Sequence, residues 1–198
     1  MKYLVIVSGP QGSGKTTQAE MVAKKFDMAL FEAGKQLRAY VAAKKPGSDD
    51  IESAMEKGVL VPHHYLNRLF VNFTEENSAR AGLVSDGFPR SLEQWGTVQE
   101  VIESSGMKVI GVFVNLRQET ALERIRKRTE TLNGQVVHRA DDTEEALKQR
   151  FATYHAETIP VLEFIREHHR LLEVDGSGSV EQVSEDIIEQ LEPLLNGS

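Results

Sequence analysis

A glycine-rich segment at residues 9–16, with the sequence GPQGSGKT, constrains the fold of this chain more than any other stretch. The apolar residues 3–7 before it predict a buried parallel strand, and residues 18–26 after it predict a helix. A strand, a glycine-rich turn and a helix with the spacing G-x-x-x-x-G-K-S/T are typical of a phosphate-binding loop. We therefore expect an α/β fold with a polyphosphate site at this junction.

The residue types in this loop suit the binding of a polyphosphate. Several backbone N–H groups must point at the phosphates, and Gly9, Gly12 and Gly14 leave room for the approach. The helix that follows directs the positive end of its dipole at the same place. Lys15 adds a mobile positive charge for the β- and γ-phosphates, and Thr16 adds a hydroxyl that can bind Mg²⁺.

Residues 82–90, with the sequence GLVSDGFPR, form the second informative segment. Residues 83–84 predict a short buried strand, and Asp86 stands at its carboxyl end. Ligands of open α/β sheets bind outside the carboxyl ends of the strands, where a carboxylate can hold Mg²⁺ directly or through its waters. The alternative interpretation is that Asp86 only begins an Asp-Gly turn.

Strand and helix patterns alternate along the rest of the chain. Further strands are predicted at 29–31, 109–114 and 171–174, and helices at 35–43, 49–57, 64–77, 92–104, 119–128, 142–157 and 180–195. We expect Asp49 and Asp50 to cap the helix at 49–57 and Gly58 to end it. Asn133 and Gly134 predict a hairpin turn within residues 129–138. The alternation implies a doubly wound, parallel, five-stranded sheet of the phosphate-loop NTPase type.

Length, charge and composition narrow the class of protein. The 198 residues suit a single domain, and the net charge of −7 does not favour a nucleic-acid partner. The absence of cysteine excludes disulfides and a cysteine-ligated zinc site, which fits a reducing cytosol. The apolar start is too short for a signal peptide, and no apolar run reaches membrane-spanning length. We therefore expect a cytoplasmic protein without a membrane partner. We also expect a monomer, although none of these properties determines the oligomeric state.

Six arginines complete the set of candidate site residues. Each falls at the end of a predicted element or in a predicted loop: Arg38, Arg90, Arg124, Arg128, Arg139 and Arg150. Phosphoryl transfer requires two anionic substrates in line with the charge between them neutralised, and the guanidinium fork can bind phosphate through two hydrogen bonds. Taken singly, any of these arginines is equally well explained as a solvated surface charge.

Taken together, these segments resemble the adenylate kinase family of nucleoside monophosphate kinases over nearly the whole chain. The matching motifs are the phosphate loop with Thr17 and Gln18, GKQLR at 34–38, GVLVP at 58–62, DGFPR at 86–90 with Gln94, RIRKR at 124–128, and RADD at 139–142 with Arg150 and Tyr154. The resemblance implies reversible phosphoryl transfer from Mg-ATP to a nucleoside monophosphate, with AMP as the favoured acceptor. It also implies one kinase domain over residues 1–198, with a mobile acceptor-binding segment at about 33–62 and a short lid at about 129–138.

The resemblance also assigns residues to each substrate. The ATP-binding residues would be Gly12, Ser13, Gly14, Lys15, Thr16, Thr17 and Arg124. The residues that bind the monophosphate would be Ala33, Arg38, Leu60, Val61, Gly87, Arg90 and Gln94, of which Leu60, Val61 and Gln94 would read the base. Mg²⁺ would be held through Thr16 and Asp86. The catalytic residues around the transferred group would be Lys15, Arg90, Arg128, Arg139 and Arg150.

Three residues depart from the family pattern and keep alternatives open. Thr16 stands where the family usually has glycine, which is more similar to thymidylate kinases. Ala33 stands where adenylate kinases usually have threonine, as in uridylate/cytidylate kinases, and Lys35 replaces an acidic residue. Gln94 favours adenine, because its amide can pair with a purine edge.

The alternatives are therefore a UMP/CMP kinase, a thymidylate kinase, a paralogue with an unusual phosphorylated acceptor, and a non-kinase phosphate-loop ATPase or switch. A guanine-dependent switch would need an aspartate after a strand to read its base, and residues 115–118, NLRQ, lack it.

Overall fold

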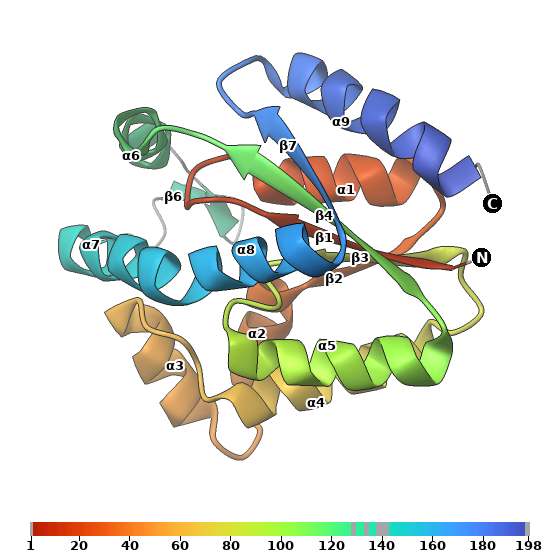
Figure 1. The fold of residues 1–198 in the computed structure, drawn as a ribbon. Coiled ribbons are helices and arrows are strands. Elements are labelled where there is room, and N and C mark those ends of the chain that lie inside the picture. Colours follow the sequence, from red (N-terminus) through yellow and green to blue (C-terminus); the bar gives the residue numbers. More distant parts are fainter. Residues whose placement is uncertain (1, 128–129, 133–134, 138–142, 197–198) are drawn as a thin grey trace.

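Five parallel strands form the central sheet, in the order β2-β3-β1-β4-β7 (Figure 1). The structure, a computed structural model, describes residues 2–127, 130–132, 135–137 and 143–196. The strands of this sheet are β1 (Tyr3–Ser8), β2 (Ala29–Glu32), β3 (Gly82–Asp86), β4 (Lys108–Asn115) and β7 (Arg170–Asp175). The predicted five-stranded, doubly wound α/β fold is confirmed.

The strand order brings two carboxyl ends together at the centre of the sheet. β1 pairs with β3 on one side and with β4 on the other, and Val7 of β1 is in register with Asp86 of β3. β2 lies outside β3, with Glu32 in register with Asp86. The strand order reverses at β1, because the chain continues from it to neighbours on both sides. In folds of this type, such a reversal leaves a crevice at the carboxyl ends of the strands, and ligands bind there. The phosphate loop follows β1, so it begins beside Asp86.

Helices cover both faces of the sheet (Figure 1). They are α1 (Lys15–Lys25), α2 (Ala33–Ala42), α3 (Ser48–Lys57), α4 (His63–Glu76), α5 (Leu92–Ser105), α6 (Gln118–Lys127), α7 (Glu144–Thr153), α8 (Ile159–His168) and α9 (Val180–Asn196). Successive side chains of β1 point to opposite faces: Leu4 and Ile6 pack with α4, α5 and α8, and Val5 and Val7 pack with α1 and α9. Within the described ranges, no helix is long and apolar enough to span a membrane.

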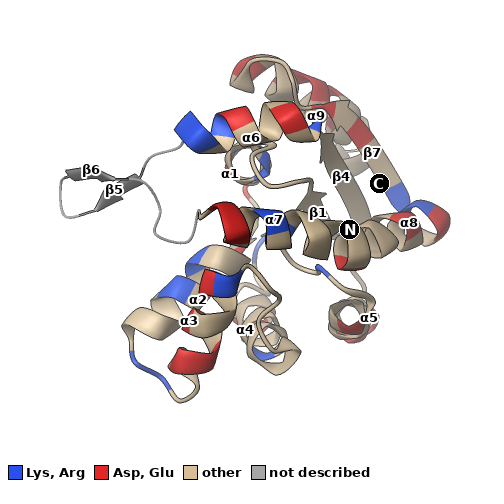
Figure 2. Ribbon diagram, turned by 90° about the vertical axis from the view of Figure 1, so that its left-hand side faces the viewer, with Lys and Arg blue, Asp and Glu red and all other residues tan. Residues whose placement is uncertain are grey.

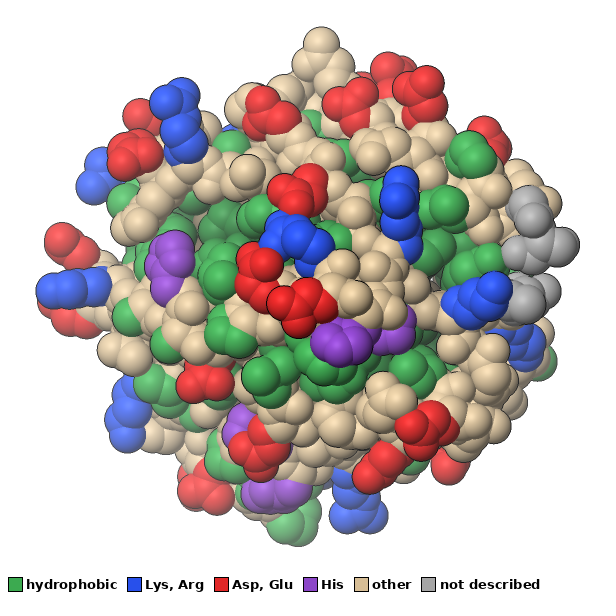
Figure 3. Space-filling model, in the orientation of Figure 1, with side chains coloured by type: hydrophobic (Ala, Val, Ile, Leu, Met, Phe, Trp, Pro, Cys, Tyr) green, Lys and Arg blue, Asp and Glu red, His purple; other side chains and the backbone are tan. Residues whose placement is uncertain are grey.

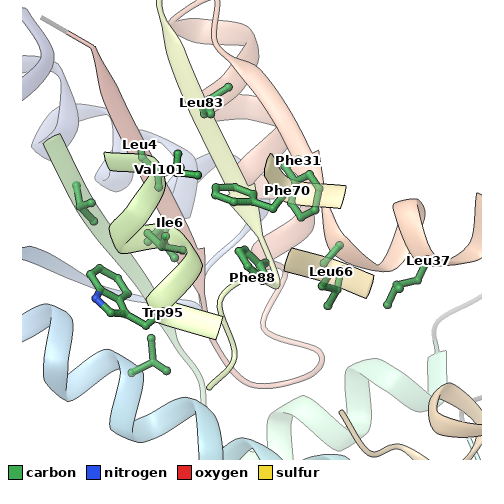
Figure 4. Packing of buried hydrophobic residues seen from close by; sticks show 14 of the residues in the cluster. Leu4, Ile6, Phe31, Leu37, Leu66, Phe70, Leu83, Phe88, Trp95 and Val101 are labelled. Carbon is green, nitrogen blue, oxygen red and sulfur yellow. The ribbon is translucent and has the colours of Figure 1, made fainter. Parts of the chain in front are cut away.

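Buried aromatic rings anchor the segment after β3 to the core. Phe88 lies 5.9 Å from Phe31 and 4.7 Å from Phe70, measured between ring centroids (Figure 4). Ser85 Oγ also donates a hydrogen bond to the carbonyl oxygen of Phe88 at 2.6 Å. Burial of a side chain of this size stabilises the fold by roughly 1.5–3 kcal/mol. The segment that continues to Arg90 is therefore fixed at the carboxyl end of β3.

The phosphate loop passes into α1 earlier than predicted. α1 begins at Lys15 rather than at residue 18, so Lys15 and Thr16 belong to its first turn. Gly14 before it has a φ of 86°, in the left-handed region that favours glycine, and no side chain caps the helix. The N–H groups of this first turn lack partners within the helix and are available to an anion.

The start of α3 also differs from the prediction. The helix begins at Ser48 after Gly47, so Asp49 and Asp50 lie in its first turn and do not cap it. Carboxylates in a first turn still interact favourably with the helix dipole. Gly58 ends α3 with a φ of 70°, as predicted.

The predicted helix at 142–157 is wrong at its C-terminal end. α7 begins after Thr143, whose hydroxyl accepts a hydrogen bond from the N–H of Ala146. It continues through a π-helical turn, Tyr154–Thr158, into α8. The sequence pattern does not predict α8, because Pro160 resembles a helix breaker. Pro160 lies in the first turn of α8, directly after the π-helical turn.

The predicted hairpin is confirmed at its two arms. β5 (Glu130–Leu132) and β6 (Gln135–Val137) are antiparallel, with Thr131 opposite Val136. The turn residues 133–134 lie outside the described residues.

Charges of both signs are mixed on the face shown in Figure 3, where acidic side chains lie beside basic ones. An ion-pair group also joins α8 to β7, since Arg166 pairs with both Glu163 and Glu173. The face shown there therefore differs from the continuous basic stripe with which proteins bind nucleic acid.

Candidate active site

A cavity of about 320 Å³ opens at the carboxyl ends of the central strands. Its wall comes from the phosphate loop, the start of α2, the connection between α3 and α4, the segment after β3 and one side of α7. The predicted site residues in this wall are Lys15, Thr16, Ala33, Arg38, Leu60, Val61, Asp86, Gly87, Arg90 and Arg150. In Figure 2, the ribbons of α2 and α7, the helices that carry Arg38 and Arg150, include segments coloured blue for lysine and arginine.

The other predicted site residues are placed differently. Those that do not line the cavity are Gly12, Ser13, Gly14, Thr17, Gln94 and Arg124. The first four lie in the phosphate loop and the first turn of α1, where the backbone would contact a ligand. Arg128 and Arg139 lie outside the described residues.

Close packing against α6 fixes the phosphate loop. A Cβ atom at Gly12 would lie 2.6 Å from the carbonyl oxygen of Ala121, so only glycine fits there. The N–H of Ser13 donates a hydrogen bond to the carbonyl oxygen of Pro10 at 3.2 Å, and Lys15 Nζ donates to the same oxygen at 3.3 Å. Lys15 therefore folds back over the loop, with its ammonium group beside the loop backbone.

The two residues predicted to hold a metal contact each other. Thr16 Oγ1 donates a hydrogen bond to Asp86 Oδ2 at 2.5 Å. The other carboxylate oxygen, Asp86 Oδ1, is buried and has no hydrogen-bond partner among the described residues. A buried carboxylate oxygen without a partner destabilises the fold, so a cation or its bound water would be favoured there.

The chemistry of this pair fits Mg²⁺. Mg²⁺ prefers oxygen ligands and is commonly held by one or two carboxylates together with substrate phosphates. Thr16 and Asp86 supply a hydroxyl and a carboxylate beside the phosphate loop. Among the described residues, no group of three or more acidic, histidine or cysteine side chains forms a closed metal site. The arrangement suits a metal that arrives with a nucleotide.

Three hydrogen bonds hold Arg90 in place. Its Nε donates to the carbonyl oxygen of Gly87 at 2.9 Å, and its backbone N–H donates to Gln94 Oε1 at 2.7 Å. Its own carbonyl oxygen accepts a hydrogen bond from Thr158 Oγ1 at 3.1 Å. The side chain and both backbone groups of Arg90 are thus fixed from three different elements.

The electrostatic surroundings of Arg90 suit an anionic ligand. Burial lowers the pKa of Arg90, the Asp86 carboxylate raises it, and the Arg150 guanidinium lowers it further. An arginine stays protonated under such influences. Two guanidinium groups that repel each other in a half-buried cavity favour an anion between them.

Gln94 is fully buried behind Arg90, in the first turn of α5. Its Oε1 is occupied by the N–H of Arg90, whereas its Nε2 has no hydrogen-bond partner among the described residues. The Gln94 side chain can therefore donate hydrogen bonds from Nε2 to a further group, but its oxygen is no longer available to accept one.

Arg124 on α6 binds the loop between β7 and α9. Its Nη1 donates to the carbonyl oxygen of Gly176 at 2.7 Å, and its Nη2 donates to those of Ser177 and Gly178 at 3.1 and 3.4 Å. A Cβ atom at Gly176 would lie 3.3 Å from the carbonyl oxygen of Ser13, so this loop lies against the phosphate loop. Arg124 is near the phosphate loop, but backbone carbonyls bind its guanidinium.

Three residues of α7 and the π-helical turn line the cavity without having been assigned a role by the sequence patterns: Thr153, Tyr154 and Thr158. Tyr154 and Thr158 follow Arg150 at intervals of four residues, and such residues share one face of a helix. This spacing is the sequence signal by which they could be found.

The family model described as Adenylate kinase matches residues 7–170 of the chain. The adenylate kinase of Methylobacterium radiotolerans is 38% identical over 192 residues, which cover 96% of this chain and 96% of that protein. The adenylate kinase of Fusobacterium nucleatum is 30% identical over 205 residues, with 94% and 97% covered. The chain belongs to the adenylate kinase family. The resemblance carried by the motifs is confirmed: the chain is a nucleoside monophosphate kinase, and the non-kinase alternative is not favoured.

Two residues that are unusual for an adenylate kinase lie in the wall of the cavity. Lys35 Nζ forms an ion pair with Glu32 Oε2 at 3.2 Å, and the Glu32 side chain is only 15% exposed. Ala33 between them is buried and has no hydroxyl to offer a ligand. The extra positive charge of Lys35 is therefore balanced locally by the Glu32 carboxylate.

Proposed function

We propose that this adenylate kinase catalyses the reversible reaction ATP + AMP = 2 ADP in the cavity described above. The observation that carries the proposal is the presence of Lys15, Arg38, Arg90 and Arg150 in one wall together with Asp86. Phosphoryl transfer depends on positioning two phosphate groups in line and on neutralising their charge. Four cations and a carboxylate that can hold a metal meet both needs.

ATP is the donor and binds at the phosphate loop. The residues proposed to hold it are Gly12, Ser13, Gly14, Lys15, Thr16, Thr17 and Arg124. Mg²⁺ bound with the nucleotide neutralises phosphate charge, and Thr16 and Asp86 are the residues that would hold it. Lys15 stabilises the charge on the transferred group, because its ammonium lies beside the loop backbone.

AMP is the acceptor and binds on the other side of the cavity. Arg38 and Arg90 bind its phosphate, with Gly87 beside Arg90, while Ala33, Leu60 and Val61 contact the base. Gln94, which lies behind Arg90 and not in the wall itself, is proposed to reach the base through its Nε2 donor, since its oxygen is already bound to Arg90. Adenine has an unprotonated ring nitrogen on its pairing edge, which accepts such a hydrogen bond. Uracil has an N–H at the corresponding place, so UMP is disfavoured.

Replacing Gln94 with leucine is expected to reduce the preference for AMP over UMP. We expect the ratio of kcat/KM for AMP to kcat/KM for UMP to fall roughly 10-fold or more, because a buried polar group then no longer discriminates between the bases. The ratio isolates base reading from the lost contact with Arg90, which affects all acceptors alike. Gln99→Leu, further along the same helix, is the matched control. An unchanged ratio in Gln94→Leu would show that another residue reads the base.

Closure of the acceptor segment and of the lid completes the proposed site. We infer that residues 33–62 move as the acceptor-binding segment and that residues 129–138 act as a short lid. One contact supports the first part: Arg150 Nη2 donates a hydrogen bond to the carbonyl oxygen of Met55 at 3.3 Å, joining α7 to α3. Arg128 and Arg139 are proposed to close over the phosphoryl group from the lid side. Such closure would exclude water and prevent hydrolysis of ATP.

The enzyme is further proposed to work as a cytoplasmic monomer, with ATP and AMP as its partners and without nucleic acid or membrane. The absence of cysteine fits a reducing compartment, and the net charge of −7 does not favour a nucleic-acid partner.

An initial-rate panel of monophosphates at fixed Mg-ATP tests the proposal. The expected order places AMP first, with UMP, CMP, GMP and dTMP at least roughly 10-fold lower in kcat/KM. A first place for UMP, CMP or dTMP would reassign the acceptor. Slow ATP hydrolysis that no monophosphate changes would contradict the kinase activity itself.

A further inference from the structure

Tyr154 lies in the wall of the cavity but takes no part in the reaction as proposed so far. It is the first residue of the π-helical turn Tyr154–Thr158, which joins α7 to α8. Turns of this kind are rare and occur frequently at functional sites. The turn therefore calls for a functional explanation at the residue that opens it.

The hydroxyl of Tyr154 is buried and has no hydrogen-bond partner among the described residues. A buried hydroxyl without a partner destabilises a fold, so a hydrogen-bond acceptor in the cavity would be favoured beside it. Burial raises the pKa of the Tyr154 hydroxyl, so it stays protonated and can donate a hydrogen bond.

The neighbours of Tyr154 indicate which kind of atom it meets. Arg150 precedes it by four residues and is close enough to Arg90 to lower the pKa of that guanidinium. Thr158 follows it by four residues and donates a hydrogen bond to the carbonyl oxygen of Arg90 at 3.1 Å. Tyr154 thus lies between two residues that both reach Arg90.

Guanidinium groups carry only hydrogen-bond donors, so an anion bound between Arg90 and Arg150 would bring acceptor oxygens to this part of the cavity. We propose that the Tyr154 hydroxyl donates a hydrogen bond to a phosphate oxygen of the acceptor nucleotide bound at Arg90. Tyr154 is then a further binding residue for the acceptor, and it contributes specificity for a phosphorylated nucleoside. The inference rests on the proposed function, since it requires the acceptor phosphate at Arg90.

Tyr154→Phe tests this inference because it removes one oxygen atom and keeps the ring. We expect KM for AMP to rise roughly 10-fold, as for the loss of a hydrogen bond to a charged group, and KM for ATP to change less than about 2-fold. The melting temperature of the unliganded enzyme should stay the same or rise, because the missing hydroxyl has no hydrogen-bond partner to lose within the described ranges of the chain.

Tyr40→Phe is the matched control. The Tyr40 hydroxyl donates a hydrogen bond to the carbonyl oxygen of Pro46 at 2.9 Å, so its loss should lower the melting temperature slightly and sets the scale for losing a satisfied hydroxyl. A fall in melting temperature for Tyr154→Phe as large as that of the control, with equal losses for ATP and AMP, would assign Tyr154 a structural function and overturn the proposal.

Adenosine separates the phosphate from the rest of the nucleotide. As a competitive inhibitor against AMP it should bind Tyr154→Phe as well as it binds the wild type, while AMP binds the variant more weakly. Equal weakening of adenosine and AMP would place the hydroxyl at the nucleoside and refute the phosphate contact. An unchanged KM for AMP would refute the inference but leave the proposed function intact, whereas a wild type that does not phosphorylate AMP would refute the proposed function.

Discussion

Lys15→Ala is expected to lower kcat by about 10³-fold or more, since one positioned charge on a transferred phosphoryl group contributes on that scale. The side chain is half-buried beside the phosphate loop, where its Nζ donates a hydrogen bond to the carbonyl oxygen of Pro10. Alanine leaves the backbone N–H groups of the loop in place. ATP binding should therefore weaken much less than turnover.

Lys24→Ala is the control for this variant, because Lys24 is exposed on the same helix and away from the cavity. Steady-state rates with Mg-ATP and AMP, together with melting temperatures, compare the two variants. Near-normal kcat in Lys15→Ala would contradict the assignment of the phosphoryl group to this loop.

Arg90→Ala is expected to impair the use of AMP far more than the binding of ATP. Arg90 is held from Gly87, Gln94 and Thr158, so its guanidinium is already positioned before a ligand binds. We expect kcat/KM for AMP to fall roughly 10³-fold, and the dissociation constant of ATP to change less than about 3-fold. Pre-positioning is the reason for the large effect, since a water-exposed arginine would contribute much less.

Two further variants sharpen the test of Arg90. Arg90→Lys keeps the charge and loses the planar fork, so it should recover only part of the activity with AMP. Arg166→Ala, at an exposed ion-pair group on α8, should leave both constants unchanged. Equal losses for ATP and AMP in Arg90→Ala would mean that Arg90 does not belong to the acceptor side.

Local patterns were sufficient to predict the features that depend on a few neighbouring residues. The spacing of the phosphate loop, the carboxylate at the end of β3 and the two arms of the hairpin each follow from stereochemistry within about ten residues. The contact between Thr16 and Asp86 was expected only as a shared metal site, yet the structure joins them directly at 2.5 Å. The parallel register of β1 with β3 explains this contact.

The features that sequence patterns did not predict depend on distant parts of the chain. The hydrogen bond from Thr158 to Arg90 spans 68 positions, and it exists only because the helix after Thr143 continues through a π-helical turn. The sequence does not predict that continuation because of Pro160, since a proline inside a helical pattern usually indicates the end of the helix. Gln94 was expected at the base, but its oxygen is bound to Arg90 and only its nitrogen is available. No periodicity carries such information, because it arises when three separate elements meet.

The most direct test of the central claim supplies ADP and Mg²⁺ as the only substrates. An adenylate kinase converts ADP into equal amounts of ATP and AMP, which chromatography of the nucleotides can follow. Lys15→Ala, prepared in parallel, shows how much of the signal comes from contaminating host enzyme. We predict equimolar ATP and AMP from the wild type, and at most about a thousandth of that rate from the variant. Failure of the wild type to form ATP from ADP, or equal rates from the two preparations, would contradict the account.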